Sequence, residues 1–579
     1  MLKRLLAVVG LAVATTAVPA FAQTGGGGLE LEFLGRYETG AFDEGAAEIV
    51  AYDVGSGLAF VTNANANTVD ALSIDDPANP TLAFTIDLAP YGAGVNSVAV
   101  FDGLVAVAVE ADVKQDNGTI AFFDARGNFK SAVTVGALPD MVTFTPDGRF
   151  VLVANEGEPN DEYTIDPEGS VSVIRIRPGR DVRQRDVRTV DFGRIRPRDL
   201  DRSVRIFGPG ASIAQDLEPE YIAVSADSRT AYVVCQENNA IVEVNIRAAR
   251  VSDIWGLGVK NHNRAANAMD ASNRDGAINI NTWPVFGIPQ PDSIATYEAG
   301  GRTFIVTANE GDARDYDGFS EEARVKDLTL DPDAFPFAAR LQLDENLGRL
   351  NITTTAGDTD GDGDFDRLFS YGARSFSIYD TRGRLVFDSG SDLEEITAML
   401  LPDNFNSTND ENDSFDNRSD DKGPEPEALT VGTIGDRTYA FIGAERVGGI
   451  FVYDITNPHD PVFESYTNSR DFSGDPEMGT AGDLAPEGLV FVSAEDSPTG
   501  EALLLAAHEV SGTTAIYRVN GGGCSVFGDV TGDCVVNLHD LFAVLAALGP
   551  CAGCPEDLNE DGRVDLIDVL LVFRAIRDR

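Results

Sequence analysis

The strongest constraint on the fold is an internal repeat that runs from about residue 30 to about residue 520. Each unit begins with an acid or amide and continues through two apolar strands joined by a turn, an Asn or Glu pair and a third strand. Residues 218–246 (EPEYIAVSADSRTAYVVCQENNAIVEVNI) and 425–455 (EPEALTVGTIGDRTYAFIGAERVGGIFVYDI) show the pattern, which occurs seven times. Alternating β-branched and aromatic residues are typical of four-stranded antiparallel sheets, and seven such sheets commonly close a ring. We therefore predict an all-β, seven-bladed β-propeller over residues 23–520.

The last unit contains only three clear strands. Residues 29–40 (LELEFLGRYETG) form a spare strand pattern near the other end of the domain. We expect this segment to be the outer strand of the last sheet and to close the ring.

Residues 521–579 form a second, smaller unit with two aspartate-rich loops of 12 residues. Oxygen donors at loop positions 1, 3, 5, 9 and 12, with the carbonyl at position 7, are the ligand pattern of a calcium loop. The expected ligands of the first loop are Asp529, Thr531, Asp533, Val535, Asn537 and Asp540, and those of the second are Asp557, Asn559, Asp561, Arg563, Asp565 and Asp568. One apolar helix is expected after each loop, with Leu541, Leu545 and Leu548 in the first and Leu566, Val569, Phe573 and Ile576 in the second.

This duplicated loop-helix unit resembles a type I dockerin, a small α-helical module with tandem EF-hand-like calcium loops. The resemblance implies calcium as the bound ion and a cohesin-like or cell-surface protein as a partner for residues 525–579. Dockerins recognise cohesin through positions next to the end of each loop, which are Leu538, His539, Leu566 and Ile567 here. The alternative is a calcium-folded structural module without a cohesin partner.

The N-terminus predicts export. Lys3 and Arg4 precede an apolar run and the Ala20-Phe21-Ala22 segment, which is typical of a signal peptide over residues 1–22. No later stretch has the roughly 20 uninterrupted apolar residues of a membrane span. With 44 basic and 94 acidic residues the net charge is −50, which opposes binding to nucleic acid and favours cations as ligands. We expect a secreted protein, extracellular or associated with a cell surface.

Four of the five cysteines lie in or beside the C-terminal unit: Cys524, Cys534, Cys551 and Cys554. Two disulfides are expected there, because a small core gains stability from cross-links, but the spacing leaves three pairings open. Cys235, in the large domain, is expected to be a buried apolar residue.

Five long segments of the large domain resemble the choice-of-anchor I family, which includes mesenchyme-specific cell surface glycoproteins. They are residues 155–170, 309–316, 353–380, 405–429 and 508–517. The resemblance implies a secreted protein with a C-terminal anchoring or sorting module. Members of the family are often labelled alkaline phosphatase-like.

Acids recur at equivalent points of the repeat. Glu48, Asp140, Glu220, Asp292, Glu427 and Glu487 start the first strands, and Glu110, Glu156, Glu237, Glu310, Glu445 and Glu509 follow the second. The inner strands of a propeller line its channel, so we expect a candidate site of Glu156, Glu220, Asp292, Glu310, Glu427, Glu445, Glu487, His508 and Glu509. Such acids need cations or arginines among them, and Arg314, Arg324, Arg374 and Arg446 are candidates. The alternative is that backbone amides satisfy these carboxylates.

A third calcium-loop pattern contains Asp358, Asp360, Asp362, Asp364 and Asp366, with Phe369 at position 12. A closing ligand would have to come from elsewhere in the fold. The alternative is a solvated acidic loop.

Eleven arginines lie between Arg175 and Arg205. Such a segment could hold a polyanion or a sulfated glycan. The favoured interpretation is an extra hairpin in which the arginines pair with Asp181, Asp186, Asp191, Asp199 and Asp201.

Motifs for catalysis are sparse. The sequence has no GxSxG or HExxH motif and only four histidines, so a zinc or iron centre is not expected. His508, beside Glu509, is a candidate general base, although a structural role is favoured. No catalytic residue is assigned. We predict a calcium-binding module for an unidentified small molecule or glycan, with a calcium-dependent phosphoesterase as the alternative. Convergence of three of Glu156, Glu220, Glu310, Glu427 and Glu487 beside an arginine would favour the enzyme.

Overall fold

The computed structural model describes residues 28–521, 530, 538–551, 554, 556, 558 and 563–577. The predicted signal peptide lies outside the described residues. So do Cys524, Cys534 and the loop ligands Asp529, Thr531, Asp533, Val535, Asn537, Asp557, Asn559 and Asp561.

Within residues 28–521 the strands form seven four-stranded antiparallel sheets. The first two contain β2 (Val50–Asp53), β3 (Leu58–Asn63), β4 (Thr68–Ser73) and β5 (Thr81–Asp87), then β6 (Gly94–Phe101), β7 (Leu104–Glu110), β8 (Asn117–Asp124) and β9 (Phe129–Ala137). The third and fourth contain β10 (Pro139–Phe144), β11 (Phe150–Asn155), β12 (Ser170–Arg175) and β13 (Val187–Asp191), then β14 (Ile222–Val224), β15 (Thr230–Cys235), β16 (Ala240–Asn245) and β17 (Arg250–Gly256).

The fifth sheet contains β20 (Ile294–Ala299), β21 (Arg302–Asn309), β27 (Ser375–Asp380) and β28 (Leu385–Asp388). The sixth contains β29 (Pro426–Ile434), β30 (Arg437–Ala444), β31 (Ile450–Asp454) and β32 (Val462–Thr467). The last contains β33 (Pro486–Val492), β34 (Leu503–His508), β35 (Thr513–Asn520) and β1 (Glu30–Glu38).

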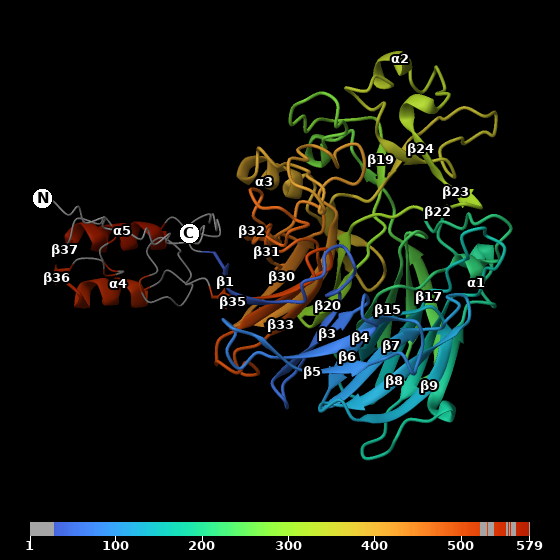
Figure 1. Cartoon of the computed structure of the whole chain (residues 1–579). Coiled ribbons are helices and arrows are strands. Elements are labelled where there is room, and N and C mark those ends of the chain that lie inside the picture. Colours follow the sequence, from blue (N-terminus) through green and yellow to red (C-terminus); the bar gives the residue numbers. More distant parts are fainter. Residues whose placement is uncertain are drawn as a thin grey trace, which may run out of the picture.

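The first strands of successive sheets contact one another in sequence order from β2 to β33, and β33 contacts β2 again. This cyclic packing of four-stranded sheets is the arrangement of a β-propeller, as the repeat predicted. Strand β1 pairs with β35 from Glu30 to Glu38, so the two ends of the domain share one sheet (Figure 1). The expectation that the N-terminal segment is the outer strand of the last unit is confirmed.

The core consists of layers between adjacent sheets. The second strand of each sheet is almost entirely buried, as in Val105–Val109 of β7, whereas the first strands are only partly buried. Hairpin turns end one strand and begin the next. In the Pro146-Asp147-Gly148 turn between β10 and β11, Gly148 adopts φ +64°. Cys235 of β15 is fully buried as a free thiol, as expected.

Long insertions extend the fourth and fifth sheets on one side of the propeller (Figure 1). They contain β18 (Lys260–Asn261), β19 (Phe286–Ile288), β22 (Asp315–Tyr316), β23 (Phe319–Ser320), β24 (Glu322–Arg324), β25 (Asn351–Thr353), β26 (Phe369–Tyr371) and α2 (Ala338–Leu341). Trp283, Phe335 and Leu347 belong to a separate apolar cluster that supports this region. Two further helices, α1 (Ile213–Asp216) and α3 (Asp392–Leu400), lie in other connections.

The prediction of an extra hairpin over residues 175–205 is wrong. Arg175 ends β12, and β13 completes the same sheet as its fourth strand. The intervening residues form an irregular connection that ends in a 3₁₀ turn over Gln184–Asp186. Part of the arginine-rich segment therefore belongs to the regular outer strand of the third sheet.

The described part of the C-terminal unit contains α4 (Leu538–Ala546), α5 (Leu566–Arg577) and the short pair β36 (Gly549–Pro550) and β37 (Arg563–Val564). Val530, Val544, Val564 and Val572 form its core. Cys551 is disulfide-bonded to Cys554. Of the apolar residues named for these two helices, Leu545, Leu548, Leu566 and Phe573 are exposed. No helix among the described residues is both long and apolar enough to cross a membrane.

Candidate functional site

The repeated acids lie where the first and second strands of each sheet begin and end. The start of the first strand is opposite the end of the second because the two strands are antiparallel: Pro139 is opposite Asn155, and Pro486 is opposite His508. A carboxylate that follows each of these positions therefore lies beside its partner from the same sheet.

A β-bulge interrupts the first strand at the acid in three sheets. The register shifts after Pro139, Pro426 and Pro486, directly before or at Asp140, Glu427 and Glu487. A bulge inserts an extra residue and turns the side chain out of the regular alternation. The recurring Pro-acid dipeptide is thus a backbone device that re-aims the carboxylate.

The residue before each of these prolines has a left-handed backbone conformation. Leu138, Glu425 and Ala485 have φ values of 45°, 51° and 60°. Their carbonyls accept hydrogen bonds from the amides of Glu156 (2.8 Å), Glu445 (2.9 Å) and Glu509 (2.9 Å), respectively. Non-glycine residues rarely adopt positive φ, and such strain is often found at functional sites. The bond holds the two acids of a sheet close together.

Acids from neighbouring sheets converge in clusters. Oxygen atoms lie within 4.8 Å of one another in the sets Glu48–Glu487–Glu509, Glu156–Glu220–Glu237, Asp292–Glu310–Glu427 and Glu310–Glu425–Glu445. Two oxygens that bind one calcium ion at about 2.4 Å can be at most about 4.8 Å apart. The first three sets therefore have the spacing of ligands to one cation, and each joins two adjacent sheets.

Among the first three sets, Glu156–Glu220–Glu237 is the best enclosed. Its three side chains are 9%, 8% and 4% exposed. Oε2 of Glu220 and Oε2 of Glu237 are buried without a hydrogen-bond partner among the described residues. Oε2 of Glu427 and of Glu487 in the other sets is also without one. Backbone amides therefore do not satisfy these four oxygens, and a cation in each cluster would do so.

Burial raises the pKa values of these acids, and the neighbouring carboxylates raise them further. The pKa of Glu48 rises to about 8 through burial and the nearby Glu509 and Asp140 carboxylates. The pKa of Glu220 is raised well above its usual range by burial, with Glu237 and Glu156 adding to the effect. The raised pKa values favour the protonated carboxyl groups, and a bound divalent cation would favour the ionised ones.

Basic side chains occupy the fourth set. Lys422 pairs with Glu310 (2.6 Å) and Glu425 (3.1 Å), and Arg446 pairs with Glu425 (3.0 Å) and Glu445 (3.1 Å). Although burial acts in the opposite direction, Lys422, Arg418 and Arg446 hold the pKa of Glu425 below its usual range. Sequence reasoning missed Lys422 and Glu425, although Glu425 precedes a Pro-acid dipeptide like those of the other units.

Three of the four arginines proposed as partners of the ring acids make their ion pairs with other acids, although Arg314 also opposes the rise that burial causes in the pKa of Glu237. Arg314 pairs with Asp216 and Glu218, Arg324 with Asp420, and Arg374 with Glu394. Only Arg446, of the four candidates, pairs with a ring acid. The connections between β13 and β14 and between β28 and β29 supply nearer acids to the other three arginines, an arrangement that residue spacing does not reveal.

The five acids chosen to discriminate between functions converge in pairs. Glu156 meets Glu220, and Glu310 meets Glu427, while Glu487 belongs to a third cluster. His508 is 2% exposed, and burial lowers its pKa, which favours the neutral, structural form. The threshold of three converging acids beside an arginine is therefore not reached.

The insertion loop brings Asp364 and Asp366 together with Asp331, whose oxygens lie within 4.8 Å of one another. Asp331 comes from outside the loop, as a closing ligand would have to. Two other aspartates of the loop accept hydrogen bonds from backbone amides: Asp358 from Gly361 (2.7 Å) and Asp360 from Asp362 (3.3 Å). Desolvation and the carboxylates of Asp362 and Asp331 raise the pKa of Asp364 to about 6.

The described ligand positions of the C-terminal loops show the same arrangement twice. Oδ1 of Asp540 accepts a hydrogen bond from the amide of Val530 (3.0 Å), and Oδ1 of Asp568 accepts one from Leu558 (2.9 Å). Each bond joins position 12 of a loop to position 2. Asp565 and Arg563 lie in the second loop, beside α5.

Comparisons with known proteins agree on the large domain. The family model described as the choice-of-anchor I domain matches residues 48–458. Gigasin-3a from Magallana gigas is 36% identical over 193 residues, which are 31% of this chain and 67% of that protein. The mesenchyme-specific cell surface glycoprotein from Strongylocentrotus purpuratus is 28% identical over 291 residues, 44% of this chain and 37% of that protein.

Solved structures resemble the chain weakly. Kuenenia stuttgartiensis hydrazine synthase aligns with a TM-score of 0.43 and 12% identity over 83% of this chain and 99% of that chain. A streptogramin B lyase aligns with a TM-score of 0.43 and 10% identity over 85% of this chain and 98% of that chain. These likenesses carry no argument about activity.

Proposed function

The chain belongs to the choice-of-anchor I domain family, and we propose that it is a secreted, seven-bladed β-propeller that binds calcium on its clustered acids and works as a cell-surface or extracellular binding module. The surface location is supported by the similarity to a mesenchyme-specific cell surface glycoprotein. The blade count is supported by the seven sheets of the described residues, whose first strands contact one another in a closed cycle.

The observation that supports calcium binding best is the unpaired oxygens of Glu220 and Glu237, which are buried beside Glu156. A buried carboxylate oxygen without a partner costs about 1–3 kcal/mol or more, so leaving two of them side by side is unfavourable. Calcium prefers carboxylate oxygens and tolerates irregular geometry, whereas magnesium requires a nearly ideal octahedron. The strained backbone before Pro139, Pro426 and Pro486 supports the same conclusion, because it places acids together at an energetic cost.

The ions are proposed to hold adjacent blades together at the inner end of the ring. The sets Glu48–Glu487–Glu509, Glu156–Glu220–Glu237 and Asp292–Glu310–Glu427 each take their acids from two neighbouring sheets. A cation shared by two sheets would cross-link them and fix the surface that a ligand meets. Because Glu220 and Glu237 are almost fully buried, their cluster suits an ion better than a substrate.

Residues 525–579 are proposed as the tether, with calcium in the two C-terminal loops. Asp540 and Asp568, at position 12 of the two loops, are both fully buried, and each accepts a hydrogen bond from the amide at position 2 of its own loop. This equivalence supports a loop that is repeated twice. Leu566, Ile567, Leu570 and Phe573 are 70%, 51%, 65% and 55% exposed, respectively. Apolar side chains exposed together on one helix favour a protein partner, for which a cohesin-like domain is the proposed class.

The alternative function is a calcium-dependent phosphoesterase. One observation favours it: Lys422 and Arg446 lie beside the acids of the Asp292–Glu310–Glu427 cluster, where they could meet a phosphoryl group. Both cations are already paired with Glu310, Glu425 or Glu445. A substrate would have to compete with these pairs, so the binding function is preferred.

The test is calcium titration of the full chain by calorimetry, with wild type compared with the Glu220→Gln/Glu237→Gln double variant. We expect the variant to lose uptake at one class of site while the C-terminal loops still bind. The matched control is Asp43→Asn/Glu44→Gln, which removes two exposed acids of the same domain and should bind as wild type does. Equal uptake by wild type and the double variant would overturn the propeller site. Turnover of p-nitrophenyl phosphate that requires calcium would favour the phosphoesterase.

A further inference from the structure

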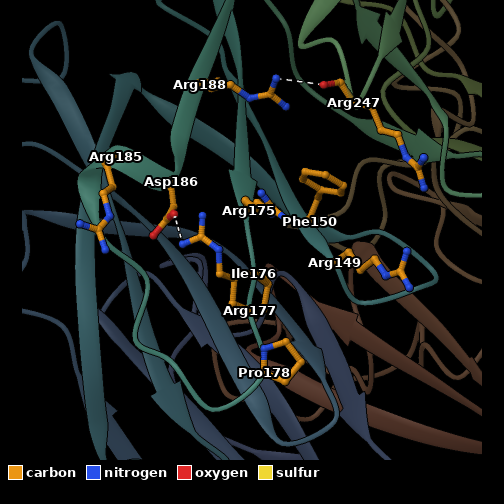
Figure 2. Close-up of a pocket in the computed structure, with 10 residues that line it drawn as sticks. All are labelled: Arg149, Phe150, Arg175, Ile176, Arg177, Pro178, Arg185, Asp186, Arg188 and Arg247. Carbon is orange, nitrogen blue, oxygen red and sulfur yellow. Dashed lines mark hydrogen bonds and ion pairs between the residues drawn. The ribbon is translucent and has the colours of Figure 1, made fainter.

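An arginine-rich cavity lies on the third and fourth sheets, apart from the acidic clusters. Its volume is 620 Å³, and six arginines line it: Arg149, Arg175, Arg177, Arg185, Arg188 and Arg247. Figure 2 shows their side chains around the hollow, with Phe150, Ile176 and Pro178 among them. The volume is in the range of about 300–1,000 Å³ that small-molecule sites occupy.

Asp186 is the one acid in the cavity lining, and it pairs with Arg177 (2.6 Å). Arg149 has a weak contact with Asp147 (3.7 Å) at the rim. Among the described residues, Arg175, Arg185 and Arg247 make no ion pair, and Arg188 donates instead to the carbonyls of Arg247 (2.9 Å) and Ile246 (3.2 Å). Of the acids expected to pair with this segment, Asp186 and Asp199 do so.

This grouping of like charges is costly unless an anion neutralises it. Arginine stays protonated at every accessible pH, so the repulsion cannot be relieved by losing a proton. The net charge of −50 does not compensate locally, because charges are screened beyond roughly 8–10 Å in physiological salt. The arginine cavity is thus a basic site on an acidic protein.

The chemistry of the lining identifies the class of anion. Guanidinium groups bind sulfate and phosphate oxygens through paired N–H donors, and several of them around one hollow favour several anionic groups on one ligand. Phe150 and Ile176 are half-buried and add an apolar wall among the arginines. A sugar ring has an apolar face for such a wall and can carry charged groups around its edge, whereas a simple inorganic polyanion has no apolar face.

We propose that the arginine cavity binds a sulfated oligosaccharide, with Arg175, Arg185 and Arg247 contacting its sulfate groups and Phe150 contacting a sugar ring. Binding at this site needs no calcium and does not rest on the acidic clusters. It would give the propeller a ligand in a sulfated extracellular matrix or glycan coat.

The experiment measures binding of a heparin-derived tetrasaccharide to the full chain by calorimetry at low salt, in chelator so that calcium sites do not contribute. We expect Arg175→Ala/Arg185→Ala/Arg247→Ala to weaken binding by about tenfold or more, because three exposed charge pairs at about 0.5 kcal/mol each are lost. None of the three side chains makes an ion pair within the described residues, so the variant should fold as wild type does.

The matched control is Arg194→Ala/Arg196→Ala/Arg198→Ala. It removes three exposed arginines from the connection that follows β13, none of which lines the cavity. We expect less than about a twofold change for this control, and no binding of the desulfated tetrasaccharide. No binding of the sulfated sugar to wild type, or equal losses in both triple variants, would overturn the proposal. Tighter binding of inorganic tripolyphosphate, lost in the cavity variant, would overturn the assignment to a sulfated sugar.

Discussion

Substitution of Glu48 by Gln should have opposite effects with and without calcium. Its carboxylate meets Glu487 and Glu509 across the contact of the first and last sheets and accepts no hydrogen bond from the described residues. Burial and the neighbouring acids Glu509 and Asp140 raise its pKa from 4.5 to about 8. The folded state therefore binds this proton more tightly than the unfolded state does, so ionisation costs stability as the pH rises from about 4.5 towards 8.

The size of the effect follows from the pKa difference. Between the pKa of 4.5 and pH 7.5, over about three pH units, the unfolded state loses this proton while the folded state keeps it. At 1.36 kcal/mol per unit, the loss of stability is about 4 kcal/mol. Because Glu48 is only partly buried and its charge is coupled to two other acids, we halve this to about 2 kcal/mol. With an unfolding entropy of about 2.1 cal/mol/K per residue over about 490 residues, this shifts Tm by about 2 °C.

In chelator at pH 7.5, Glu48→Gln should raise Tm by about 2 °C, because the neutral amide removes the burial cost of the carboxylate. In saturating calcium, wild type should gain about 3 °C at a calcium concentration of about 100 Kd, and the variant should gain much less because one ligand is lost. Differential scanning calorimetry measures both. Glu44→Gln is the control, since it removes an exposed acid four residues away and should change neither value.

A carboxylate that only stabilises the fold would behave differently. Glu48→Gln would then lower Tm in chelator, and the calcium-dependent gain would equal that of wild type. That result would refute the proposal that these acids bind calcium.

Two further predictions follow from the same structure. Calcium binding at pH 7 should release protons, because burial and the neighbouring acids raise the pKa of Glu48 to about 8 and a bound cation favours the ionised carboxylate. The heat of binding in buffers of different ionisation enthalpy should reveal the release, which should weaken as the pH rises above about 8. Leu31→Ala should lower the free energy of unfolding by about 3 kcal/mol, because Leu31 of β1 is 2% exposed and belongs to the core beside β35. Glu30→Ala on the same strand is the control and should cost less than about 1 kcal/mol, as measured by denaturant unfolding. Equal losses would argue against β1 as the closing strand.

The arrangement of strands could be predicted because it depends on neighbours in sequence. Alternation of apolar residues specifies which segments are strands, and short turns pair each strand with the next. The closing role of residues 29–40 was also predictable, since the last unit lacks one strand and these residues supply the pattern. For the same reason the acids could be placed at strand ends, where the repeat puts them in every unit.

Other features depended on contacts between distant segments. Arg314, Arg324 and Arg374 form ion pairs with acids of the connections between sheets, while Lys422 pairs with Glu310, 112 residues away in sequence. Asp331 meets Asp364 and Asp366 only through the folding of the insertion. No local pattern encodes such pairs, because they depend on how loops of different sheets pack together.

The sequence by itself therefore determined the propeller class, the closing strand and the register of the acids, because each follows from a periodicity of two or from repetition along the chain. Only the tertiary structure decided which acids share a cluster, which of them lack partners and where the arginines surround a cavity. Adjacent sheets meet through side chains whose neighbours come from separate units, and burial of those side chains sets their charge state. Both the acidic clusters and the arginine cavity arise at such contacts between sheets.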